Sequence, residues 1–224
     1  MSIDHVLPSS PDAPVRRGRS RRWPAGDLRA REGKEVAVLV NNAGIAFKGD
    51  TWGAEEARQT IETNLRGTRR MTEAMMPLLT PHARVVNVSS RAGLLSIFAA
   101  GRAEATDRIA REGSVQDVDG VAEDFLRSVA DGSYADKGFP RSMYGVSKAL
   151  ENAYTRVVAR EAARDCPGLL VAAMCPGWCA TDMSSWRGPR SAAQGADTAV
   201  WLCVAPEESI QTGQFWADRQ RISW

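Results

Sequence analysis

The chain has 224 residues, of which 43% are hydrophobic, and this suits a single domain with a sizeable core. Its 29 basic and 27 acidic residues leave a net charge of +2, which gives no sign of a nucleic-acid or membrane partner for the body of the chain. No apolar run approaches the roughly 20 residues needed to span a bilayer. The two histidines, His5 and His82, lie in no recognisable nucleophile motif, which argues against a Ser-His-Asp hydrolase.

The cysteines are Cys166, Cys175, Cys179 and Cys203. Cys175 and Cys179 lie close in sequence, but their spacing is not the C-x-x-C of a metal knuckle. No second cysteine pair or histidine cluster accompanies them. We therefore predict no metal site and reduced thiols, as is typical of a cytoplasmic protein.

Residues 1–35 differ in character from the rest of the chain. They are rich in proline, carry an arginine cluster over residues 16–22, and show little helix or strand periodicity. This composition predicts a disordered Arg/Pro-rich arm. The arginine and serine content leaves open a transit peptide, which would direct the protein to an organelle, although Asp4 and Asp12 count against it. Binding of RNA or an acidic partner also stays open, although Trp23 is the arm's one aromatic of the kind that stacks on bases.

From residue 36 onward the chain alternates β-prone apolar runs with stretches of helical periodicity. Residues 36–40 are a continuous apolar run, typical of a strand buried on both faces of a parallel sheet. The predicted strands are 36–40, 84–88, 169–175 and 214–218, and the predicted helices are 55–79, 143–164 and 192–204. This alternation predicts an α/β fold with a doubly wound parallel sheet.

Residues 91–141 form a long excursion before the predicted helix 143–164. Part of the excursion has apolar residues at the spacing of an amphipathic helix. These residues are Val118, Val121, Phe125, Leu126 and Val129. Ser142 is a good N-cap for the helix that follows the excursion.

Each polar motif of the chain follows one of the predicted strands. Asn41-Asn42-Ala43-Gly44 follows the first strand, Ser89-Ser90 the second and Pro176-Gly177 the third. In doubly wound sheets, ligands bind outside the carboxyl ends of the strands. We therefore expect these three motifs to lie together at a binding site.

Tyr144 and Lys148 form a candidate acid/base pair. They are four residues apart, so on a helix both side chains lie on one face. A free tyrosine has a pKa of about 10 and exchanges protons slowly near neutral pH. A nearby ammonium favours the phenolate and lowers that pKa toward the range of efficient proton transfer.

These motifs, in this order, resemble the short-chain dehydrogenase/reductase family. The motifs that carry the similarity are Asn41-Asn42-Ala43-Gly44, Asn64 within a helix, Ser90, Tyr144-x-x-x-Lys148 and Pro176-Gly177. Longer runs at 41–48, 84–90, 175–183 and 213–224 resemble the monomeric carbonyl reductases. The resemblance implies a Rossmann-like fold over residues 36–224, NADP(H) as cofactor, and a small-molecule carbonyl substrate such as a ketone, aldehyde or quinone.

The resemblance also implies a role for each matching residue. Tyr144 would protonate the carbonyl oxygen and Ser90 would hold that oxygen by hydrogen bonding. Lys148 would bind the nicotinamide ribose and lower the pKa of Tyr144, and Asn64 would position a water in the proton relay. The residues implied to contact the cofactor, besides Tyr144 and Lys148, are Asn42, Ala43, Gly44, Pro176, Gly177, Cys179 and Thr181.

Two further implications concern surfaces. The excursion at 91–141 matches an extra segment that covers the tetramer surface of other family members, so the resemblance implies a monomer. Trp178 is expected to line an apolar substrate pocket, with plain packing as an equal alternative. Trp186 could line the same pocket, but plain packing is the favoured expectation for it.

The chain departs from the family at its start. The family opens with a strand and a turn, T-G-x-x-x-G-x-G, that holds the cofactor pyrophosphate at a helix N-terminus. Residues 1–35 contain no such motif. We therefore expect the first βαβαβ portion of the fold to be absent, with residues 36–224 as the C-terminal part of the reductase domain.

This departure has two expected consequences. The strand at residues 36–40 would become a sheet edge, and an apolar edge strand promotes aggregation. NADPH binding by the chain would be weak, because the pyrophosphate site supplies much of the cofactor's binding energy. The alternative function is accordingly a catalytically silent reductase fragment that acts at most as a binding module.

Overall fold

The computed structural model describes residues 35–224, so the arm predicted over residues 1–35 lies outside the described residues except for Glu35. The described residues form a five-stranded sheet in the order β1-β2-β3-β4-β5. The strands are β1 (Val36–Asn41), β2 (Leu79–Val88), β3 (Leu170–Met174), β4 (Phe215–Ala217) and β5 (Gln220–Ile222). The first four strands pair in parallel, and β5 pairs antiparallel with β4. The predicted parallel sheet is confirmed, and the antiparallel β5 adds to it.

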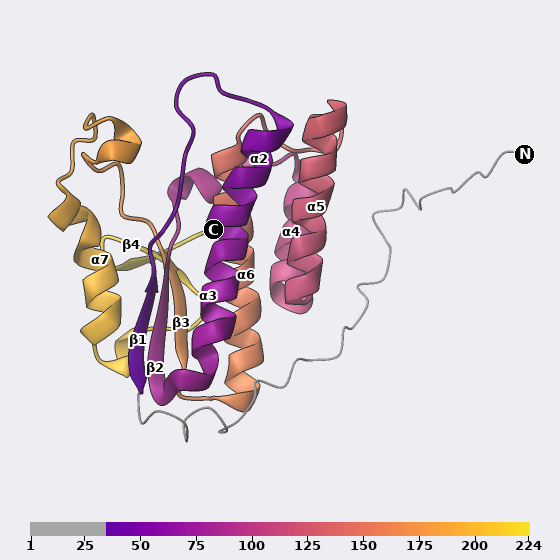
Figure 1. Cartoon of the computed structure of the whole chain (residues 1–224). Helices are drawn as coiled ribbons and strands as arrows, with labels where there is room; N and C mark the ends of the chain where they lie inside the picture. Colours follow the sequence, from indigo (N-terminus) through magenta and orange to yellow (C-terminus); the bar gives the residue numbers. More distant parts are fainter. Residues whose placement is uncertain (1–34) are drawn as a thin grey trace, which may run out of the picture.

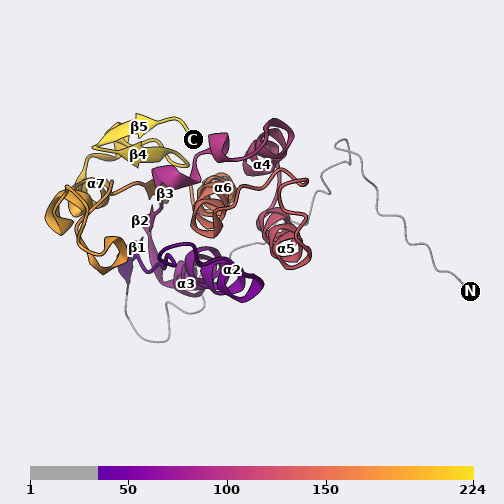
Figure 2. The same cartoon turned by 90° about the horizontal axis from the view of Figure 1, so that it is seen from above.

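Helices cover both faces of the sheet, as a doubly wound fold requires (Figures 1 and 2). Helix α7 (Ala192–Val204) covers one face, and α2 (Ala54–Ile61), α3 (Thr68–Met75) and α6 (Met143–Asp165) cover the other. Helices α4 (Ala100–Glu112) and α5 (Val115–Asp131) form an outer layer beyond α6. Helix α6 is therefore enclosed by the sheet on one side and by helices on the other.

Alternating side chains of the inner strands supply the two hydrophobic cores. Val85 of β2 and Val171 of β3 point into the core shared with α6, while their neighbours Val86 and Ala172 point into the core shared with α7. All four are buried. Since successive residues of a strand face opposite sides of the sheet, a strand covered on both sides needs an unbroken apolar run.

Strand β1 lies at the edge of the sheet, and within residues 35–224 its one strand neighbour is β2. Val38 and Val40 are 38% and 41% exposed. The predicted edge position is thus confirmed for the described residues. The expectation that this run is buried on both faces is wrong, because α7 packs mainly on β2 and β3 and leaves Val38 and Val40 partly exposed.

The single helix predicted over residues 55–79 is divided in the structure. Between α2 and α3 lies a π-helical segment, η1 (Glu62–Gly67), and after α3 comes a 3₁₀ turn, η2 (Met76–Leu78). In a π-helix each N–H bonds one residue farther back than in an α-helix, so the turn is wider. Asn64 lies in this wide turn, and its side chain faces the interior.

The excursion at 91–141 is helical, as predicted, but it contains α4 as well as the predicted helix. The predicted amphipathic stripe lies on α5, where Val118, Val121, Phe125 and Val129 are buried. Ser114 and Asp117 form a capping box at the start of α5. Two short 3₁₀ turns, η3 (Arg91–Gly93) and η4 (Leu95–Ile97), lead from β2 into α4. None of the helices within residues 35–224 has both the length and the apolar character to cross a membrane.

Candidate active site

The three polar motifs lie beyond the carboxyl ends of neighbouring strands, as predicted. Asn42 to Gly44 follow β1, Ser90 follows β2, and Pro176 with Gly177 follow β3. The sheet order places these strands side by side, so their ends meet at one edge of the sheet. The first turn of α6, which carries Tyr144, reaches the same edge.

Tyr144 and Ser90 interact through their hydroxyl groups. The Ser142 side chain caps α6 by accepting a hydrogen bond of 3.1 Å from Gly145 N, and this fixes the turn that presents Tyr144. Ser90 in turn caps η3, where its hydroxyl accepts a hydrogen bond of 3.1 Å from Ala92 N. The Ser90 hydroxyl is thus held by the local backbone, and Tyr144 lies in the helical turn that Ser142 caps.

Burial raises the pKa of Tyr144 above its ordinary value of 10.0. The charge of Lys148 and the hydrogen bond with Ser90 lower it, while Glu151 and Cys175 act in the same direction as burial. Lys148 Nζ lies 5.9 Å from the centre of the Tyr144 ring. The effect expected of Lys148 is therefore present, but the net shift is upward. The phenol stays protonated near neutral pH, which is the form that donates a proton.

The Lys148 ammonium is buried and hydrogen-bonded twice. Nζ donates to Val88 O at 2.7 Å and to Glu151 Oε2 at 2.8 Å. A lysine ammonium has three N–H donors, so one remains for a further acceptor. Burial raises the pKa of the Glu151 carboxyl, and the charge of Lys148 acts against that effect.

Asn64 is fully buried, and both the oxygen and the nitrogen of its amide are hydrogen-bonded. Oδ1 accepts a hydrogen bond of 2.8 Å from Ile45 N, and Nδ2 donates to Ile45 O at 2.9 Å and to Ser147 Oγ at 2.9 Å. The side chain therefore fastens the loop after β1 to the helix that carries Tyr144. A Cβ at Gly44 would lie 3.3 Å from Asn64 Oδ1 and 3.6 Å from Lys148 Nζ, so the loop backbone passes close to both side chains.

Asn42 and Ala43 are exposed and line a cavity of about 420 Å³ beside β1. The opposite wall of this cavity comes from η1 and α3, through residues that include Thr63 and Met71. The cavity thus runs along the edge strand and ends at the same loop that Asn64 holds. The cavity is therefore a candidate binding site for a part of the cofactor that extends from Gly44 toward Asn42 and Ala43.

The segment after β3 is shaped by close contacts. Gly177 has a φ of +77°, and a Cβ there would lie 2.7 Å from Arg190 Cδ. Cys179 Sγ contacts Pro176 O at 3.4 Å. Thr181 caps the 3₁₀ turn η5 (Asp182–Ser184). Cys179 and Thr181 are thus held by their own segment, which Gly177 and Arg190 tie to the start of α7.

The two tryptophans of this segment are both exposed, Trp178 by 59% and Trp186 by 68%. The packing role expected for Trp186 is therefore wrong. Trp186 lies in a turn with a φ of 61°, and its Nε1 donates to Asp182 Oδ1 at 3.1 Å instead of entering a core. Trp178 stays a candidate for the wall of a substrate pocket.

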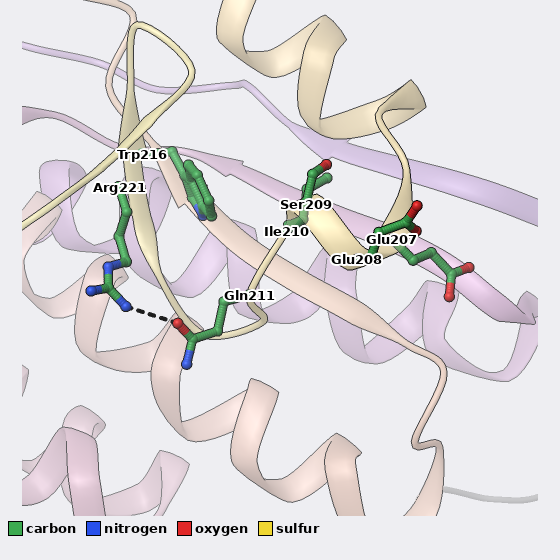
Figure 3. A pocket seen from close by; sticks show the side chains of 7 residues that line it. All are labelled: Glu207, Glu208, Ser209, Ile210, Gln211, Trp216 and Arg221. Carbon is green, nitrogen blue, oxygen red and sulfur yellow. Dashed lines mark hydrogen bonds between the residues drawn. The ribbon is translucent and has the colours of Figure 1, made fainter.

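A second cavity, of about 490 Å³, lies between residues 207–211 and the β4–β5 hairpin (Figure 3). Trp216 forms one wall, and Arg221 donates a hydrogen bond of 2.8 Å to Gln211 Oε1. The cavity includes none of the predicted site residues and is not part of the candidate site.

The structure also describes the thiols and the possible metal ligands. The four cysteines are free thiols. Within the part of the chain that the structure describes, no three histidine, cysteine or acidic side chains gather as they would around a metal ion.

Sequence reasoning missed several polar residues of the buried site. Ser147, Glu151 and Thr155 on α6 are all buried, and Thr68 on α3 contacts Glu151 Oε1 at 3.2 Å. A signal was available, because Ser147, Glu151 and Thr155 recur at spacings of four on the face that also carries Lys148.

The sequence of the chain is similar to those of known reductases. The short chain dehydrogenase family model matches residues 28–102. The chain is 35% identical over 204 residues to carbonyl reductase (NADPH) 1 of Mus musculus, an alignment that covers 88% of this chain and 73% of the relative. It is 34% identical over 207 residues to carbonyl reductase (NADPH) 3 of Rattus norvegicus, with the same coverage of 88% and 73%.

A solved structure gives the same result for the fold. Salutaridine reductase from Papaver somniferum superposes with a TM-score of 0.73 at 25% identity, covering 84% of this chain and 74% of that protein. The family model, the identity to the mammalian relatives and the fold all give the same assignment. The chain belongs to the short-chain dehydrogenase family.

Proposed function

We propose that the chain catalyses NADPH-dependent reduction of carbonyl compounds, with ketones, aldehydes and quinones as the substrate class. The observation that carries the proposal is the hydroxyl pair of Ser90 and Tyr144 beside the buried ammonium of Lys148. The names of the mammalian relatives, which are NADPH carbonyl reductases, support the same activity.

The residues present fit the nicotinamide end of NADPH. Lys148 keeps one N–H donor for a ribose hydroxyl, and the missing side chain of Gly44 leaves room next to Lys148 Nζ and Asn64. The cavity lined by Asn42 and Ala43 extends from this point. The residues proposed to hold the cofactor are Asn42, Ala43, Gly44, Tyr144, Lys148, Pro176, Gly177, Cys179 and Thr181. Bound NADPH supplies a hydride to the carbonyl carbon.

The protein's own contribution is to bind the carbonyl oxygen and provide its proton. Negative charge grows on that oxygen during reduction, and hydrogen bonds from the Ser90 and Tyr144 hydroxyls stabilise it. Tyr144 then donates its proton, and Lys148 stabilises the phenolate that remains. Both N–H groups of the Asn64 amide are used by Ile45 and Ser147, so Asn64 would position the relay water through an acceptor oxygen. We assign this part to its backbone carbonyl, which accepts from Thr68 Oγ1 at 3.0 Å.

Trp178 is the residue proposed to contact the substrate outside the hydroxyl pair. It is exposed in the segment after β3 and offers an aromatic face to an apolar carbonyl compound. Trp178→Ala is expected to raise KM for bulky aromatic ketones and to leave small aldehydes nearly unaffected. Trp186→Ala, which removes an equally exposed indole held by Asp182, is the matched control.

The assay follows the absorbance of NADPH at 340 nm with the purified chain and a panel of quinones, ketones and aldehydes. Turnover that disappears in Tyr144→Phe supports the proposal. Failure of every substrate at saturating NADPH, with a folded protein, would overturn it.

A second candidate is the catalytically silent fragment that binds a carbonyl compound without reducing it. It is favoured by one observation, the lack of a T-G-x-x-x-G-x-G turn in the sequence. Titration with NADPH, followed by nicotinamide fluorescence, separates the two. We expect a Kd above the micromolar range, and turnover at high NADPH would still reject the silent fragment.

We further propose a cytoplasmic monomer. In the described residues, α4 and α5 lie over the outer side of α6 and would keep a second subunit from packing there. The four free thiols fit a reducing compartment. Light scattering of the purified chain tests the monomer, and microscopy of a tagged chain tests the compartment.

A further inference from the structure

Glu151 is a buried carboxylate next to the reacting groups. Its side chain is 1% exposed, Oε2 accepts from Lys148 Nζ at 2.8 Å, and Oε1 lies 3.2 Å from Thr68 Oγ1. Glutamate is almost never fully buried unless it is paired. The ion pair with Lys148 supplies that partner here and orients the carboxylate.

The contacts of Glu151 also fix the direction of the lysine. Val88 O lies on one side of the Lys148 ammonium and Glu151 Oε2 on another. The third N–H is the one left to face a ribose hydroxyl or the tyrosine. Glu151 therefore determines both where the ammonium points and how much of its positive charge reaches Tyr144.

We propose that Glu151 is a positioning residue that acts through Lys148 to keep Tyr144 in its proton-donating form, so that the enzyme favours carbonyl reduction over alcohol oxidation near neutral pH. This rests on the carbonyl reductase function proposed above. Reduction needs the phenol of Tyr144 as an acid, while oxidation of an alcohol needs the phenolate as a base. A negative group that offsets the lysine charge makes the phenolate less favourable. It therefore raises the pH at which the phenol and the phenolate of Tyr144 are equally populated.

The groups around Tyr144 come from several elements. Lys148 and Glu151 face it from α6, Ser90 from the loop after β2, and Cys175 from the end of β3. Burial is the largest influence and raises the pKa of Tyr144, and the Glu151 carboxylate adds to it. Lys148 and Ser90 oppose both. The 2.8 Å ion pair with Lys148 favours the charged form of Glu151 against the effect of burial. We therefore expect removal of this charge to leave the ammonium unopposed and to lower the pKa of Tyr144.

The test compares Glu151→Gln and Glu151→Leu with Glu104→Gln. Glu104 is an exposed residue of α4, so its substitution makes the same change of charge far from the site. In both Glu151 variants we expect the alkaline limb of kcat/KM for reduction to move to lower pH by about one unit. Alcohol oxidation at pH 7 should rise about tenfold, because one pKa unit changes the phenolate fraction tenfold. Glu104→Gln should match the wild type.

A readout without turnover separates this inference from the proposed function. The chain has only 3 tyrosines, so ¹³C-labelled tyrosine gives few resonances, and Tyr144→Phe assigns that of Tyr144. We expect Tyr144 to titrate above its ordinary pKa of about 10 in the wild type and lower in the Glu151 variants. If these shifts appear without turnover, the positioning role stands and the proposed function fails.

Two results would overturn the inference. One is a Tyr144 titration that is the same in a folded Glu151 variant as in Glu104→Gln, which would make Glu151 a purely structural partner of Lys148. The other needs no variant and applies even if neither Glu151 variant folds. It is a wild-type Tyr144 that titrates below its ordinary pKa.

Discussion

Asn64 Nδ2 donates a hydrogen bond of 2.9 Å to Ser147 Oγ, which joins η1 to the helix that carries Tyr144. Ser147 Oγ in turn donates to Tyr144 O at 2.8 Å. The Asn64 amide also holds both backbone groups of Ile45. A single side chain therefore connects the loop after β1 with the first turn of α6, so the two parts of the site cannot shift independently.

The first prediction is that Asn64→Ala lowers the free energy of unfolding by about 1–3 kcal/mol, because it leaves the backbone groups of Ile45 without their partner. Urea unfolding followed by circular dichroism measures the change. Asn42→Ala, at an exposed position, should change stability by less than about 0.5 kcal/mol. Equal effects of the two substitutions would contradict the connecting role of Asn64.

The second prediction separates the two members of the acid/base pair. Tyr144→Phe should abolish reduction and leave NADPH binding nearly intact, because it removes the proton donor and almost no packing volume. Lys148→Ala should weaken both, since Lys148 is proposed to serve the ribose as well as the tyrosine, and it should also reduce stability by leaving Glu151 buried without its ion-pair partner.

NADPH titration and turnover measured on the same preparations decide this comparison. A Tyr144→Phe protein that keeps most of its turnover would remove Tyr144 from the mechanism. Thermal unfolding of Lys148→Ala shows whether weaker NADPH binding comes from the lost lysine contact or from a general loss of stability.

The third prediction concerns acid sensitivity at Asp124. This carboxylate joins three parts of the outer layer, accepting from Arg102 of α4 at 2.7 Å and from Lys137 at 2.8 Å. Burial raises the pKa of Asp124, but the hydrogen bond from Lys137 and the charge of Arg102 outweigh it, so the pKa lies below its ordinary value of 3.8. Its stabilising effect is therefore present above pH 4 and is lost as the pH falls through the lowered pKa.

Asp124→Asn should accordingly cost about 1 kcal/mol at pH 7 and progressively less as the pH is lowered from 4. Urea unfolding of both proteins at a series of pH values measures the difference. A difference that stays constant down to pH 2 would show that packing, and not ionisation, accounts for it.

The fourth prediction concerns the exposed edge of β1. Val38→Lys should reduce aggregation of the purified chain, because a charge on an edge strand disfavours pairing with another strand. Val204→Lys is the matched control, since Val204 is 75% exposed on α7 and not on a strand. Light scattering at rising protein concentration compares them, and equal behaviour would mean that β1 is not where association begins.

The order of strands and helices could be predicted from the sequence because local pattern decides it. The helix 192–204 was placed at its observed ends, and the N-cap at Ser142 was correct. The π-helix at 62–67 could not be predicted from local pattern, because it accompanies a contact of Asn64 with Ile45, which is distant in sequence.

The buried polar residues of the site were harder to predict for a different reason. A glutamate within a helix usually faces water. Glu151 is buried because α6 is enclosed by the sheet and by the outer helices, and enclosure of this kind depends on the tertiary arrangement. The raised pKa of Tyr144 follows from the same enclosure, whereas the sequence pair alone indicated only the effect of Lys148.

The π-helical turn makes this part of the chain sensitive to length more than to composition. Deleting one residue between Glu62 and Gly67 would let α2 and α3 merge into one regular α-helix with a full set of hydrogen bonds. Because the wide turn takes up one extra residue, α2 and α3 would keep nearly the same faces, and the backbone around Asn64 would change most. The Asn64 amide would then leave Ile45 and Ser147, so a more regular helix would form at the expense of the loop that it holds in place.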